Sequence, residues 1–113
     1  MPPPPLRNSY LAIVEARKIL DYALSPDNPV GRHKARVFAA ALGVDRSNGH
    51  LLVEAIRRGV MTSPAEPGMV DAYGARYRVD LPLTGPRVSA VVRTAWIYRT
   101  GSDVPELVTL HVL

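Results

Sequence analysis

The fold of this chain is decided by the stretch RYRVDLPLTGPRVSAVVRTAWIY, residues 76–98. Its first part alternates apolar and charged side chains with a period of two, which is typical of a strand with one buried face. Residues 84–87 have the composition of a turn, and the apolar run 88–98 predicts a longer second strand. A last strand is expected over residues 106–112. The stretch therefore predicts the centre of an antiparallel meander.

Helical spacing of apolar residues predicts three helices before this meander. The first is expected over residues 15–24 and ends at the breaker run Ser-Pro-Asp-Asn-Pro, residues 25–29. The second buries a stripe formed by Ala35, Phe38, Ala39 and Leu42, with Gly43 as its C-terminal cap. The third is capped by Asp45 or Ser47 and buries Leu51, Leu52, Ala55 and Ile56.

The order of these elements predicts an α+β fold, with three helices on one face of an antiparallel meander of three or four strands. Barnase and RelE-type ribonucleases have a similar order of elements, by analogy at the level of fold only. We expect residues 1–9 to form a flexible proline-rich tail. Residues 10–113 are then expected to form a single domain.

Strand alternation predicts which side chains face away from the helices. With Tyr77, Val79 and Leu81 turned inward, Arg76 and Arg78 face outward. In the next strand the set Val88, Ala90, Val92, Thr94, Trp96 and Tyr98 is aromatic-rich and uncharged, so we expect it in the core and Arg93 outside. In the last strand Val108, Leu110 and Val112 are expected inward, which leaves Thr109 and His111 outside. A single bulge would reverse such an assignment.

The composition of the chain limits the partners and the kinds of binding site that we expect. The chain has 113 residues, a formal net charge of +4 and a pI near 9.9, a mild preference for anionic partners. It has no cysteine, and its three histidines lack metal-ligand spacing, so we expect neither a metal site nor a cofactor. No secretion signal or membrane-spanning apolar run is present, which favours a soluble cytoplasmic protein that does not bind membranes.

The segment Gly31-Arg32-His33-Lys34-Ala35-Arg36 places basic side chains in the first turn of the second helix. The helix dipole makes this end positive, so cations there weaken the helix. Free amide N–H groups and clustered cations at a helix start form a receptor for phosphate. We therefore interpret His33, Lys34 and Arg36 as a candidate phosphate site, against the alternative of an ordinary solvated turn whose aliphatic stems cover the core.

Several blocks of the sequence resemble an uncharacterised bacterial domain family. They are Leu24-Ser25-Pro26, residues 29–38, Leu42-Gly43, Tyr73-Gly74-x-Arg76-Tyr77, residues 83–86 and residues 92–97. Members of this family occur as small stand-alone proteins and as C-terminal domains of polymorphic, contact-dependent toxins. The resemblance implies a cytotoxic effector, most often a nuclease, that a small immunity or antitoxin protein neutralises. It also implies that relatives carry an aromatic residue in place of His111.

The leading hypothesis is a toxin that cleaves RNA without a metal, by general acid and base catalysis. Such a reaction needs a base, an acid and fixed cations on the scissile phosphate. The candidate catalytic residues are His33, Lys34, Arg93, Thr109 and His111, and the candidate substrate-binding residues are Arg36, Tyr73, Arg76 and Arg78. If His111 is not the shared base, His33 or a tyrosine takes that role.

Two alternatives stand beside it. The chain is either a non-catalytic module that binds protein or nucleic acid, such as an antitoxin or adaptor, or a phosphate or nucleotide binder that uses the same helix start. Outward-facing Arg, Thr and His side chains are also common on a solvated antiparallel sheet, where they carry no function.

Overall fold

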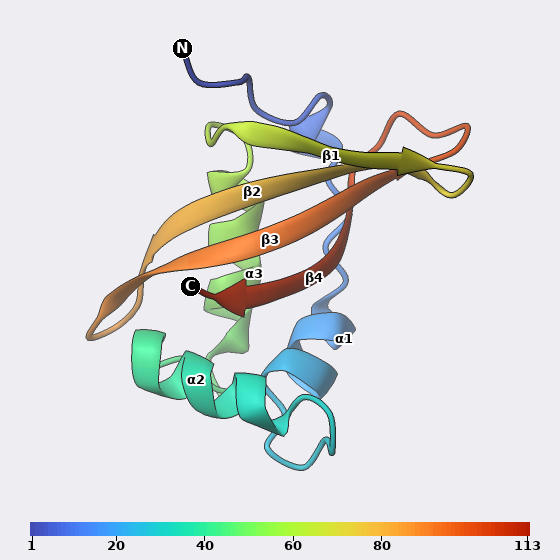
Figure 1. Ribbon diagram of the computed structural model, residues 1–113. Helices are drawn as coiled ribbons and strands as arrows, with labels where there is room; N and C mark the ends of the chain where they lie inside the picture. Colours follow the sequence, from blue (N-terminus) through green and yellow to red (C-terminus); the bar gives the residue numbers. More distant parts are fainter.

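A four-stranded antiparallel sheet with the order β1-β2-β3-β4 forms one layer of the computed structural model, which describes all residues 1–113 (Figure 1). The strands are β1 (Ala65–Asp71), β2 (Gly74–Thr84), β3 (Ser89–Arg99) and β4 (Glu106–Val112). The predicted central hairpin is confirmed, since β2 and β3 pair without interruption from Thr84↔Ser89 to Gly74↔Arg99.

Strand β1 is the element that the sequence did not assign, because Pro67 and Gly68 are typical of a loop. It lies at the edge of the sheet and pairs only with β2, so Pro67 removes no essential ladder hydrogen bond. Its register shifts between Pro67 and Val70, which marks a bulge. The sheet therefore has the upper of the two predicted numbers of strands.

The helices occupy the predicted places and pack on one face of the sheet. The first consists of α1 (Ala16–Lys18) and the π-helical turn η2 (Ile19–Ala23), after a 3₁₀ turn, η1 (Ser9–Leu11). Helices α2 (Arg32–Leu42) and α3 (Gly49–Gly59) follow. Figure 1 shows α3 behind β2 and β3 and α2 beside β4, with the opposite face of the sheet free of helices. We call that free side the open face.

The ends of the helices match the prediction in one case and correct it in the other. Gly43 caps α2 in the left-handed region, with φ 67°. The N-cap residue of α3 is Asn48 rather than Asp45 or Ser47, and its side chain makes no capping hydrogen bond. Asp45 instead accepts a hydrogen bond from the backbone N–H of Ser47, at 2.8 Å, in the preceding turn.

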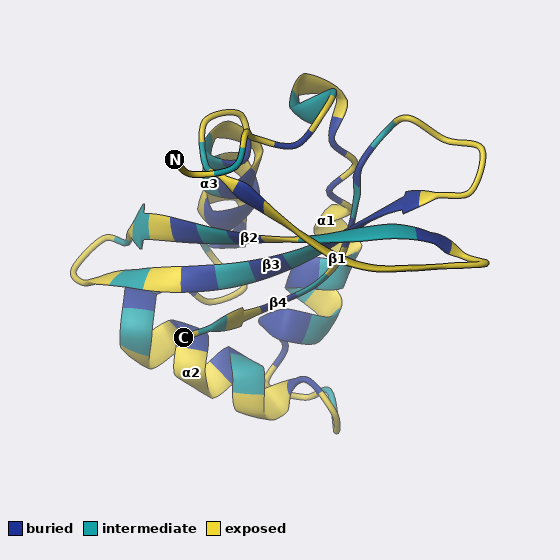
Figure 2. Cartoon of the chain, turned by 45° about the horizontal axis from the view of Figure 1, so that its top comes forward, coloured by how far each residue is buried: buried dark blue, intermediate teal, exposed yellow.

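The core lies between the helices and the inner face of the sheet. Val79, Leu81, Val92 and Trp96 are fully buried, as the strand alternation predicted (Figure 2). Thr94 is buried beside them, where its hydroxyl donates to the Val79 carbonyl at 2.7 Å and accepts from the Trp96 indole at 2.7 Å. Thr94 is the one buried polar residue of the sheet, and its hydroxyl is hydrogen-bonded on both sides.

Two helical positions were predicted in the core and are not there. Ala39 is exposed, and Leu51 is 47% exposed. In α3 the buried positions are Leu52, Val53 and Ile56, so the apolar face is rotated toward Val53 and away from Leu51. A rotation of this size moves one flanking residue out of a stripe and another in, because successive helical residues are about 100° apart.

Strand β4 corrects the predicted alternation at one position. Val108 was expected inward but is 47% exposed, and Leu107 is buried in its place. Trp96 pairs with Leu107 while Ala95 pairs with Thr109, so Val108 is the extra residue of a bulge. Beyond the bulge the predicted alternation holds, with Leu110 buried in the core and Thr109 and His111 on the outer side.

The proline-rich start of the chain packs on the domain from Pro4 onward. The backbone N–H of Ala65 donates to the Pro4 carbonyl at 3.0 Å, Leu6 is buried, and the Tyr98 hydroxyl donates to the Arg7 carbonyl at 2.6 Å. The guanidinium of Arg7 also lies 4.6 Å from the centre of the Tyr98 ring. Of residues 4–9, Leu6 is part of the core, while Pro4, Pro5 and Arg7 stay exposed.

Candidate functional site

The start of α2 meets β4 at the edge of the sheet, and the candidate catalytic residues of the two elements come together there. The ammonium of Lys34 donates a hydrogen bond of 3.0 Å to the hydroxyl of Thr109. A hollow of about 170 Å³ lies beside this bond. We call it the α2–β4 hollow; its lining residues are His33, Lys34, Val37, Phe38, His111 and Val112.

Local structure places Lys34 in this position. Gly31 begins α2 directly against the backbone of Tyr22, where any side chain would overlap with the Tyr22 carbonyl. The Asn28 side chain accepts from the N–H groups of Val30 and Gly31, at 2.9 Å each, and so orients the turn before the helix. The Lys34 ammonium then lies 5.6 Å from the centre of the Tyr22 ring, a cation–π distance. Partial burial lowers the pKa of Lys34.

The cations in the first turns of α2 have no acidic partner. Arg32, Lys34 and Arg36 form no ion pair, and α2 contains no acidic residue. His33 and Arg36 lie three residues apart, so they share a face of the helix. The positive end of the helix dipole adds to their charge. This part of the molecule therefore attracts anions.

The open face differs, because three of its four arginines, Arg76, Arg93 and Arg99, are paired with carboxylates. Arg93 donates two hydrogen bonds to Asp80, at 2.9 and 3.0 Å, and Arg76 contacts Asp71 at 2.6 Å. The hydrogen bond from Arg93 is the main reason that the pKa of Asp80 is lowered. Of the remaining arginines of this face, Arg99 contacts Glu106 at 2.6 Å, whereas Arg78 stands opposite Glu66 in the β1–β2 register but forms no ion pair.

The predicted site residues thus separate into groups. His33, Lys34, Thr109 and His111 gather at the α2–β4 hollow. Arg93 stands opposite His111 in the β3–β4 register, but Asp80 holds its guanidinium. Farther away are Arg76 and Arg78 on the open face, and Tyr73, which is 72% exposed at the β1–β2 turn. Arg36 is exposed on α2 and makes no ion pair.

Sequence reasoning missed two residues that shape the site. Asp80 neutralises Arg93, a role that strand alternation alone does not indicate. Its position opposite Arg93 follows from the length of the β2–β3 turn, so the hairpin register could have revealed it. Tyr22 is half-buried and packs against Lys34. No local pattern indicates that contact, because it depends on how η2 and α2 dock.

Two further properties concern the whole chain. No cluster of three or more His, Cys, Asp or Glu side chains has an arrangement that could hold a metal ion. None of the helices has the length and apolar character that crossing a membrane requires.

The comparisons with known proteins give one match. Neither a curated protein nor a solved structure matches the chain. The match is to a family described as a domain of unknown function, and it extends over residues 5–113, nearly the full length. The aligned region includes the packed N-terminal segment, α2 and β4. On this match, the chain belongs to the domain-of-unknown-function family DUF6883.

Proposed function

We propose that this chain is a metal-independent ribonuclease whose reaction takes place at the α2–β4 hollow. The observation that supports the proposal most is that His111 lines one small hollow together with His33 and Lys34, although it is far from them in the sequence. Two imidazoles and an ammonium group supply the three functions that the reaction needs: a base, an acid and a fixed cation.

The reaction would proceed through the ribose itself. One neutral imidazole takes the proton of the 2′-hydroxyl, whose oxygen attacks the neighbouring phosphorus. The bond from phosphorus to the 5′ oxygen breaks, and the other imidazole, in its protonated form, gives its proton to that oxygen. The products are a 2′,3′-cyclic phosphate and a 5′-hydroxyl. Lys34 stabilises the negative charge that grows on the phosphate oxygens.

The direct test is incubation of purified protein with RNA in the presence of EDTA. We expect cleavage, with 2′,3′-cyclic phosphate and 5′-hydroxyl ends. RNA methylated at the 2′ oxygen and DNA are the matched controls, and both should stay intact because they lack the attacking hydroxyl. Cleavage of DNA, or cleavage that needs a divalent cation, would contradict the mechanism.

The pH dependence assigns the two histidines to their roles. A base that must be neutral gives the acidic limb of a bell-shaped rate profile, and an acid that must be protonated gives the basic limb. Loss of the acidic limb in His33→Ala would identify His33 as the base. The resemblance points the same way, because relatives that carry an aromatic residue in place of His111 cannot use that position as a base. His111 would then be the acid.

The resemblance to toxin domains supports the wider part of the proposal, that the chain is a toxin neutralised by a small antitoxin or immunity protein. Expression of the intact chain alone should arrest bacterial growth, and co-expression of the product of the adjacent reading frame should restore it. Harmless overexpression of folded protein would contradict this part, whatever the outcome of the RNA assay.

The unpaired cations at the start of α2 also fit a second candidate, a module that binds RNA or protein without cleaving it. Arg32 and Arg36 form no ion pair, so they could contact phosphates whether or not a reaction follows. A binding module would retain RNA in a filter or gel-shift assay and give no products. Its affinity would decrease with salt, as phosphate contacts require.

A further inference from the structure

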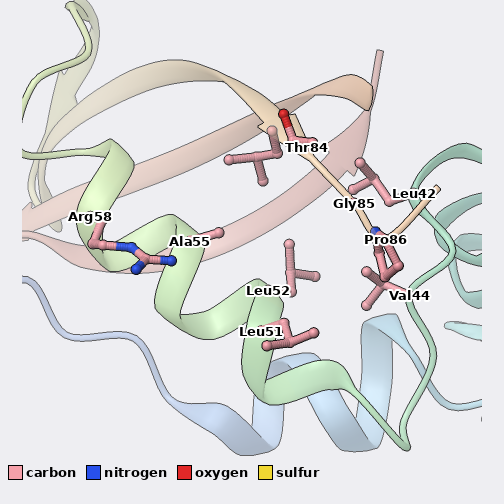
Figure 3. Close-up of a pocket in the computed structure, with 10 residues that line it drawn as sticks. Leu42, Val44, Leu51, Leu52, Ala55, Arg58, Thr84, Gly85 and Pro86 are labelled. Atoms are coloured by element: carbon pink, nitrogen blue, oxygen red, sulfur yellow. The ribbon is translucent and has the colours of Figure 1, made fainter. Parts of the chain in front are cut away.

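A second hollow lies away from the α2–β4 hollow, at the other end of α2. It is a groove of about 390 Å³ between the end of α2, the outer side of α3 and the β2–β3 turn (Figure 3). This volume falls within the range of about 300–1,000 Å³ that is usual for small-molecule sites. The proposed ribonuclease reaction does not use any of its residues.

The groove has a rigid apolar floor. Leu42 and Leu52, 1% and 2% exposed, form the floor, and Leu51, 47% exposed, forms one wall. The opposite wall is the β2–β3 turn, whose Gly85 lies so close to the Leu42 carbonyl that a side chain there would overlap with it. This close approach of the two backbones fixes the β2–β3 turn against the end of α2.

One end of the groove carries a free cation. Figure 3 shows Arg58 reaching toward the groove along α3, at the end opposite Leu42 and Pro86. The guanidinium of Arg58 makes neither an ion pair nor a hydrogen bond, although Glu54 lies one helical turn before it. A guanidinium presents paired N–H donors that match the two oxygens of a carboxylate.

We propose that this groove binds a small amphipathic organic acid, with its apolar body over Leu51, Leu52 and Leu83 and its carboxylate at Arg58. Charge complementarity selects the anionic head, and the apolar lining selects the body. The apolar surface that the groove leaves exposed is small, which favours a small molecule over a protein as its ligand. The floor is already buried, so Leu51 is the main apolar side chain left exposed for a partner, far less than a stable protein interface needs.

Decanoate is a suitable probe, used below the concentration at which it forms micelles and followed by ¹H–¹⁵N NMR. We expect saturable shifts of the amides of Leu52 and Ala55. Arg58→Gln should weaken decanoate binding about tenfold, the loss of one charge-assisted interaction. Arg17→Gln removes the same charge from an exposed, unpaired position on α1 and should leave binding unchanged. Thermal unfolding of each variant checks that the fold is intact.

Two further ligands separate charge recognition from simple hydrophobic adsorption. 1-Decanol should bind weakly and equally to the wild type and to Arg58→Gln. Arg58→Glu should reverse the preference, so that decylammonium binds better than decanoate. The proposal is overturned if millimolar decanoate leaves the Leu52 and Ala55 amides unshifted, or if Arg58→Gln binds decanoate as tightly as the wild type. These readouts do not involve RNA, so they succeed or fail independently of the proposed ribonuclease reaction.

Discussion

At the start of α2, Arg32, Lys34 and Arg36 have no carboxylate partner, whereas on the open face Arg76 and Arg93 each contact one. Both regions are rich in basic residues, and in the sequence they look equally suited to bind phosphate. The ion pairs distinguish them, because a phosphate that binds Arg76 or Arg93 must first displace a carboxylate. Local compensation of charge, more than the number of arginines, decides where an anion binds.

The largest effect that would test this contrast is the loss of an imidazole. His33→Ala and His111→Ala should each lower the rate of RNA cleavage by about 10²–10⁴-fold, the usual contribution of a general acid or base. Arg76→Ala on the open face should change the rate by less than about threefold, since its guanidinium is already committed to Asp71. Rates are measured on a defined oligonucleotide under single-turnover conditions. Equal losses of cleavage rate in all three variants would mean that the two regions do not differ in function.

Loss of the Lys34 cation should come next. Lys34→Gln should lower the cleavage rate by about 10²-fold, as removal of one transition-state donor usually does. Lys18→Gln is the matched control, because Lys18 is half-buried on α1 and donates to the Leu107 carbonyl at 3.1 Å, outside the hollow. A comparable loss in Lys18→Gln, or none in Lys34→Gln, would remove Lys34 from the reaction.

The Thr109 hydroxyl should have a smaller effect, because it acts through Lys34. Thr109→Val keeps the shape of the side chain and removes the 3.0 Å hydrogen bond to the ammonium. We expect the cleavage rate to decrease about tenfold or less. Thr109→Ser retains the hydroxyl and should recover most of the rate; if it does not, Thr109 acts through packing.

The smallest effect is expected from release of an arginine on the open face. Asp80→Asn frees Arg93, so RNA affinity should increase a few-fold. The slope of log affinity against log salt concentration should steepen by about 0.7 for each added phosphate contact.

The same ion pair makes stability depend on pH. The folded-state pKa of Asp80 is lowered, so the contribution of this carboxylate to the free energy of unfolding is complete above its unfolded pKa, about 4. That contribution is lost as pH falls through the folded-state pKa. Below pH 4 the unfolding temperature of Asp80→Asn should therefore decrease less steeply than that of the wild type. Unchanged affinity and the same acid profile would mean that Asp80 does not restrain Arg93.

Much of the fold could be predicted from local patterns. The alternation around Val79 and Leu81 and the turn at residues 84–87 are enough to place the central hairpin and its buried face. Strand β1 escaped prediction because Pro67 is tolerated only where no partner strand needs its N–H, and edge position is a property of the whole sheet. The bulge at Val108 also escaped, because the local sequence gives no sign of an extra residue.

The candidate site could be predicted only as separate halves. The basic start of α2 and the outward Thr109 and His111 each follow from periodicity, but their meeting does not. The contact between Lys34 and Thr109 depends on how α2 docks beside β4, which is set by packing of Phe38 and Leu42 in the shared core. The compensation of Arg93 by Asp80 was within reach, since it needs only the hairpin register.

The most direct test of the central claim, that nucleic acid binds at the start of α2 and not on the open face, is a ¹H–¹⁵N NMR titration with 2′-O-methyl RNA, which cannot be cleaved. We expect the largest amide shifts at His33, Lys34 and His111, with small shifts at Arg76 and Arg99. Largest shifts along β2 and β3 at Arg76, Arg78 and Arg93, with an unperturbed α2, would contradict it.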